Sequence, residues 1–85
     1  MPPQHLDGEQ LHMLERVITS PAAGTFMPHV LSAGVVEVDD VLGHVRTNDD
    51  LVPVRSAFRG HVVEVVAAAG QRMQPHERIA WLRVA

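Results

Sequence analysis

Six histidines are the side chains of this sequence best suited to hold a metal ion: His5, His12, His29, His44, His61 and His76. None of them forms an H-x-x-x-H or H-x-H pair on one element, and no cysteine is present to assist them. His29 and His44 lie in strand-like runs, where they could face one another across a sheet. We expect solvated or hydrogen-bonded histidines and no metal site.

Two acidic pairs, Asp39-Asp40 and Asp49-Asp50, are the candidates for acid–base chemistry. Such chemistry needs two carboxylates that converge on one substrate. Sequence neighbours on a turn usually point apart and stay solvated, and Asp40 has the setting of a turn residue. We therefore expect both pairs to be non-catalytic, with Asp49 and Asp50 exposed.

Nucleophiles are scarce, because the chain has no cysteine and no lysine. Its serines, Ser20, Ser32 and Ser56, lie in strand or turn contexts, and no Asp-Ser-Leu motif precedes a helix as a phosphopantetheine site would require. No set of nucleophile, base and orienting residue is visible. The sequence predicts a protein that is not an enzyme.

Composition limits the remaining classes. A chain of 85 residues with 46% hydrophobic side chains has room for one domain with one core. A net charge of −3 with dispersed arginines argues against nucleic-acid binding. No apolar run approaches 18 residues and no signal-peptide pattern opens the chain, so we expect no membrane span and a cytoplasmic location.

Residues 1–16 differ from the rest and are expected to form an N-terminal arm. After Pro2-Pro3, the spacing of Asp7 and Gln10 is typical of a capping box, so a short helix is possible. A helix of one or two turns is not stable alone. The arm either frays or docks, on its own domain or on a partner.

From residue 17 to residue 85 the chain repeats itself. Gly24 and Gly60 are 36 residues apart, and so are Gly34 and Gly70. Ser20 and Ser56 match at the same offset, which becomes 37 beyond the second glycine. Two copies of this length are too few for a solenoid, so the repeat predicts a pseudo-twofold domain in which each copy supplies half of one core.

Each copy has the pattern strand, turn, strand, glycine turn, strand. Valine-rich runs follow the first glycines, at Thr25–Leu31 and His61–Val66, and the stretch Ala67–Ala69 is expected to be the end of the second run. Pro53 cannot donate a ladder hydrogen bond, so its strand must lie at a sheet edge or carry a bulge. The pattern predicts an all-β flattened barrel or sandwich.

Ordered motifs in both halves resemble the biotinyl/lipoyl carrier domains. Residues 20–26 (SPAAGTF), followed by Gly34, Val36, Asp40 and Leu42, resemble the first half of such domains. Residues 70–79 (GQRMQPHERI) resemble the second half. The resemblance implies two four-stranded antiparallel sheets and a hairpin between the halves that displays the modified lysine.

That lysine is missing. Counting forward from Leu42 or back from Gly60 places Asp49 at its position, within the tip Asn48, Asp49, Asp50 and Leu51. Biotin and lipoate are attached through an amine, which an aspartate lacks, and no lysine elsewhere can substitute. We expect no bound cofactor, and we regard the tip as a candidate partner-recognition hairpin.

Two functions stay open. The first is a non-carrier interaction subunit that scaffolds or modulates a partner enzyme, either an acyltransferase of the 2-oxo acid dehydrogenase type or a biotin-dependent carboxylase subunit. The second is an accessory subunit of an acyltransferase that uses acyl-CoA or acyl carrier protein in specialised, polyketide-type biosynthesis. Exposed valine and leucine side chains could equally make a homodimer.

Overall fold

The computed structural model describes residues 14–29 and 34–84. Throughout these residues the regular secondary structure is β-strand. The described part of the chain has no helix long and apolar enough to cross a bilayer. Most of the predicted arm, including its short helix, lies outside the described residues.

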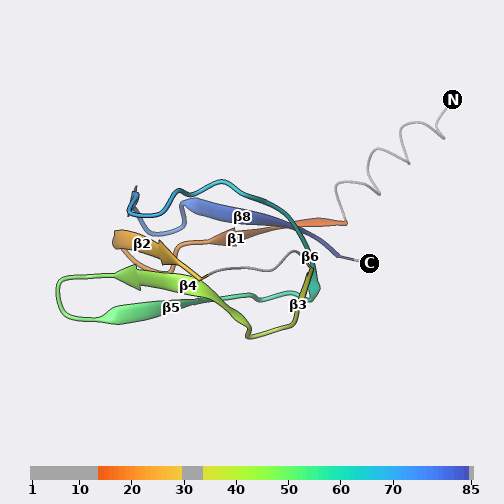
Figure 1. Cartoon of the computed structure of the whole chain (residues 1–85), viewed down its shortest axis with the longest axis horizontal. Helices are drawn as coiled ribbons and strands as arrows, with labels where there is room; N and C mark the ends of the chain where they lie inside the picture. The colour runs from red at the N-terminus through yellow and green to blue at the C-terminus, as the bar shows by residue number, and fades with distance from the viewer. Residues whose placement is uncertain (1–13, 30–33, 85) are drawn as a thin grey trace, which may run out of the picture.

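Eight strands make up the domain (Figure 1). They are β1 (Glu15–Thr19), β2 (Gly24–Pro28), β3 (Val35–Val36), β4 (Val41–Arg46), β5 (Leu51–Arg55), β6 (Gly60–Val65), β7 (Arg72–Met73) and β8 (Arg78–Arg83). All the strand pairs are antiparallel, in two four-stranded sheets of order β1-β8-β6-β3 and β5-β4-β2-β7. The predicted flattened barrel-sandwich is confirmed.

The topology has the twofold symmetry that the repeat predicts. Replacing β1 to β4 by β5 to β8, and the reverse, converts the order of one sheet into that of the other. Each sheet therefore takes two strands from each half of the chain. Neither half forms a sheet by itself, because its strands pair mainly with those of the other half.

One apolar core fills the space between the sheets. Its largest fully buried apolar side chains come in repeat-related or facing positions: Phe26, Leu42, Val45, Val54, Met73, Ile79 and Leu82. Leu42 and Ile79 are equivalent at the offset of 37 residues, and both are at most 2% exposed. Because both copies line one core, apolar burial in either half depends on the other half.

Two buried serines link the halves by reciprocal hydrogen bonds. The amide of Ser20 donates to the carbonyl of Glu77 (2.8 Å), and the carbonyl of Ser20 accepts from His76 (2.8 Å). Ser56 makes the equivalent bonds with Asp40 (2.9 Å) and Asp39 (2.7 Å). Each hydroxyl also bonds within its own turn, to the carbonyl two residues on. Each half thus satisfies the buried serine of the other.

Close backbone approach explains the first glycine of each copy. A Cβ on Gly60 would lie 2.6 Å from the carbonyl oxygen of Arg83, and one on Gly24 would overlap the carbonyl of Arg46. Neither position accepts a side chain without a shift of the neighbouring strand. The spacing of the repeat therefore marks the equivalent points at which paired neighbouring strands approach closely.

Of two further sequence predictions about the strands, one is confirmed and one is wrong. Pro53 lies on β5, which is an edge strand, as predicted. The prediction that Ala67–Ala69 forms a strand end is wrong. The amides of Val66 and Ala67 both donate to the carbonyl of Ile79, at 2.8 and 3.2 Å, so the ladder breaks there and β6 ends at Val65.

Candidate functional site

The hairpin between β4 and β5 joins the two halves of the repeat. It protrudes at the end of the molecule opposite to the start of β1 (Figure 1). Arg46 and Leu51 are its last paired residues, and Asn48 and Asp49 form the turn itself. Asp49, to which the sequence comparison assigned the carrier position, therefore lies at an exposed tip.

Thr47 organises this tip with one hydroxyl group. Its Oγ1 accepts from the amides of Asp50 (2.9 Å) and Asp49 (3.3 Å) and donates to the carbonyl of Asp50 (3.2 Å). The amide of Thr47 donates to the same carbonyl at 2.9 Å. One donor and two acceptor sites are all that a hydroxyl offers, so Thr47 is fully used.

The turn departs from the usual two-residue hairpin. Such turns favour positive φ at one or both central residues, because that twist matches the twist of the strands. Among the described residues, positive φ occurs at Asp39, His76, Gly34 and Gly70, and not at the tip. The Thr47 side chain accepts the Asp50 amide that a primed turn would pair with the backbone, and this stabilises the alternative turn.

The carboxylates of the tip are unpaired. Asp49 and Asp50 are exposed, and neither forms an ion pair with another described residue. In contrast, the Asp40 carboxylate accepts from the amide of Glu37 at 2.8 Å, which confirms its turn role. The two acidic pairs thus have different roles, and the tip offers solvated negative charge with no amine.

A row of four residues crosses the outer face of the sheet beside the tip. Leu51 pairs with Arg46, Arg46 with Thr25, and Thr25 with Arg72, across β5, β4, β2 and β7. Directly opposed residues project from the same face of a sheet. We call these four residues the outer row. Leu51 is the only member that the sequence had singled out, and it is 51% exposed.

Two arginines of the outer row are free to bind something else. Five of the seven arginines contact another described group, for example Arg59 with Glu37 and Arg78 with Trp81. The side chains of Arg46 and Arg72 make no hydrogen bond, ion pair or ring contact with any described residue. In the sequence these two appear as dispersed charges, so composition alone could not find them.

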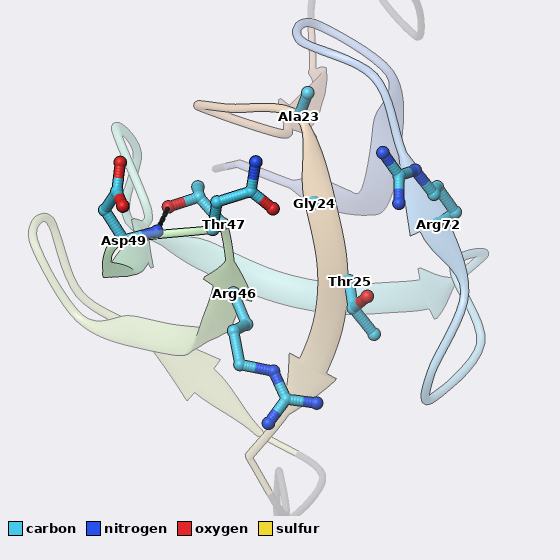
Figure 2. Close-up of a pocket in the computed structure, with 8 residues that line it drawn as sticks. Ala23, Gly24, Thr25, Arg46, Thr47, Asp49 and Arg72 are labelled. Carbon is cyan, nitrogen blue, oxygen red and sulfur yellow. Dashed lines mark hydrogen bonds between the residues drawn. The ribbon is translucent and has the colours of Figure 1, made fainter.

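A polar cleft of about 400 Å³ connects the outer row with the tip. Figure 2 shows Arg46 and Arg72 on either side of the strand that carries Gly24 and Thr25, with Asp49 bonded to Thr47 at the rim. Its lining residues are Ala23, Gly24, Thr25, Arg46, Thr47, Asn48, Asp49 and Arg72. The site combines two guanidinium donors, the Thr25 hydroxyl and a solvated carboxylate, which suits recognition of charged groups.

Comparison with known proteins relates the fold to parts of larger enzymes. No family model and no curated protein matches the chain. Among solved structures, it superposes on urea carboxylase of Kluyveromyces lactis with a TM-score of 0.71 and 17% identity, over 80% of this chain and 6% of that one. A single-chain, multi-domain long-chain acyl-CoA carboxylase gives 0.75 and 12%, over 85% and 7%.

Another solved structure with this fold is not named as a carboxylase. A succinylglutamate desuccinylase/aspartoacylase family protein of Shewanella amazonensis gives a TM-score of 0.69 and 17% identity, over 85% of this chain and 21% of that one. In every case the chain spans a small part of the larger protein. The TM-scores establish a shared fold, which is the fold that the sequence motifs had indicated. At identities this low, the comparison shows the fold alone.

Thr47→Ala is expected to loosen the tip without unfolding the domain. Loss of a hydroxyl that makes three hydrogen bonds should cost about 1 kcal/mol in the free energy of unfolding. Amide hydrogen exchange at Asp49 and Asp50 should accelerate, as nuclear magnetic resonance would measure. Thr47→Ser keeps the hydroxyl and serves as the control. Equal exchange rates in both variants would contradict this role of Thr47.

Proposed function

We propose that this chain is a non-catalytic interaction subunit with a carrier-type fold, which presents its β4–β5 hairpin and outer row to a partner enzyme. The observation that supports this proposal most directly is the structure of the tip. A hairpin at the carrier position is kept and held by Thr47, but its turn contains Asp49 and the chain has no lysine. A surface remains where a prosthetic group has no attachment point.

The surface is bipolar, and this specifies the partner chemistry. Asp49 and Asp50 supply negative charge at the tip, and Arg46 and Arg72 supply positive charge beside it. A complementary partner carries lysine or arginine opposite the tip and aspartate or glutamate opposite the outer row. Leu51, exposed at the end of the row, gives an apolar contact at low desolvation cost.

The partner class is inferred from the structural neighbours. Two of them are named as carboxylases, one of them multi-domain, and the matching parts make up only 6% and 7% of those chains. This supports a partner enzyme of the carboxylase or acyl-transfer type, for which the chain acts as a scaffold or modulator. The cytoplasmic location expected from the sequence belongs to the same proposal.

A second candidate is favoured by the polar cleft. Acyl-CoA and phosphopantetheine-bearing carrier proteins both present phosphate groups, and paired arginines are well suited to bind phosphate. In this version the chain is an accessory subunit of an acyltransferase in specialised metabolism. The two versions differ in whether the complex requires a phosphate-bearing substrate in order to form.

Asp49→Lys tests whether Asp49 occupies the carrier position. Incubated with a biotin ligase or a lipoyl ligase, this variant is expected to gain one covalent group, measured by intact-protein mass spectrometry. Asp50→Lys places the same amine one residue along and should stay unmodified, because the ligase reads the position of the tip. Modification of Asp50→Lys alone would contradict the assignment.

The interaction itself is tested with a partner captured from the native host, identified by mass spectrometry and then purified. Binding measured by calorimetry should weaken roughly tenfold, about 1.4 kcal/mol, in Asp49→Asn/Asp50→Asn and in Arg46→Gln/Arg72→Gln. The aspartate changes remove charge at constant side-chain size, and the arginine changes replace a guanidinium with a shorter neutral amide. Added acyl-CoA should strengthen binding only if the second candidate is correct.

The matched control is Arg59→Gln, which removes an exposed arginine paired with Glu37 away from the cleft. It should leave the dissociation constant within about twofold, because the charge lies outside the proposed surface. Equal weakening in the control and in the outer-row variant would show that only net charge matters. That result would overturn the assignment of the surface.

A further inference from the structure

Two of the histidines form a close pair on the outer face of the β5-β4-β2-β7 sheet. His44 lies on β4, opposite Met27 of β2, and His29 directly follows β2. His29 Nε2 lies 3.1 Å from His44 Nδ1, with ring centroids 5.0 Å apart and the rings tilted by 44°. The sequence suggested that the two could face one another, and the structure confirms it.

The backbone holds the pair in place. The amide of His29 donates to the carbonyl of Leu42 at 3.0 Å, which continues the β2–β4 ladder by one step. His44 lies within β4, which is paired on both sides with β2 and β5. The Cα positions of both histidines are therefore fixed by strand pairing, and only their side-chain torsions are free to adjust.

The nitrogen separation suits a shared metal ion. Imidazole nitrogens bind a tetrahedral zinc ion at about 2.0–2.1 Å, which places two such ligands roughly 3.3–3.4 Å apart. The observed 3.1 Å is shorter by a few tenths of an ångström. Turning each ring by roughly 35°, so that both nitrogens point at one ion in tetrahedral geometry, would replace the hydrogen bond with two metal bonds. This turn uses side-chain torsions alone.

The proton balance also permits this exchange. Each neutral imidazole carries one N–H, so the pair has two protons on four nitrogens. One of these N–H groups donates the hydrogen bond between the rings. With metal bound, each imidazole keeps one proton on the nitrogen that faces away from the ion. The protons move between ring nitrogens, and no net proton is lost from the neutral pair.

We propose that His29 and His44 form a two-histidine chelate for a divalent transition-metal ion of the copper, nickel and zinc class, for which imidazole is a suitable ligand. No group of three or more histidine or acidic side chains among the described residues could complete a closed site. The ion therefore keeps open positions that water fills, and it exchanges more readily than a structural zinc. This goes beyond the proposed function and revises the expectation of no metal site.

The test titrates the intact chain with Cu²⁺, Ni²⁺, Co²⁺ and Zn²⁺ salts by calorimetry, and follows Cu²⁺ by paramagnetic broadening of amide signals. A 1:1 site is expected, with affinity rising from Co²⁺ through Ni²⁺ to Cu²⁺ and falling again at Zn²⁺. Broadening should centre on residues 27–29 and 42–45. Excess chelator should restore the signals.

Removing one histidine should lower the Cu²⁺ affinity about tenfold or more, because a bidentate site becomes monodentate. His29→Gln and His44→Gln retain a hydrogen-bonding side chain, so each variant should keep the fold. His61→Ala and His76→Ala remove exposed histidines elsewhere and should change the affinity by less than about twofold. Broadening centred elsewhere, or equal losses in all four variants, would overturn the proposal.

Discussion

The structure depends on the exchange of hydrogen bonds between two buried serines and two turns. Ser20 is bonded to the turn of the second half, and Ser56 to the turn of the first half. Both serines are 1% exposed, so these hydrogen bonds form away from water, and each contributes about 0.5–1.5 kcal/mol net to the association of the halves. The shared apolar core adds to this coupling, so the two halves can only fold as one body.

The hairpin tip lies outside this network, and that separation explains how the fold tolerates an aspartate at the tip. Thr47 closes the turn with local hydrogen bonds, and the exposed side chains of Asp49 and Asp50 contribute nothing to the core. The residue at the tip can therefore change in chemistry and charge without unfolding the sheets. In the adjoining outer row, the side chains of Arg46 and Arg72 likewise contact no other described group.

The symmetric fold could be predicted from the sequence because the repeat repeats its turn residues, and turn residues are constrained locally. The offsets that align Gly24 with Gly60 and Ser20 with Ser56 correspond to equivalent contacts in space. Only part of the candidate site could be predicted from the sequence. Asn48, Asp49, Asp50 and Leu51 adjoin in sequence, but the outer row joins residues of four strands, and its register depends on pairing. Likewise, facing histidines could be anticipated, but their separation of 3.1 Å could not.

The central claim is that a carrier-type fold here works without any tethered prosthetic group. Intact-protein mass spectrometry of the chain purified from its own cells tests this most directly. We predict a mass without any addition that corresponds to biotin or a lipoyl group. A covalently bound biotin or lipoyl group would contradict the claim.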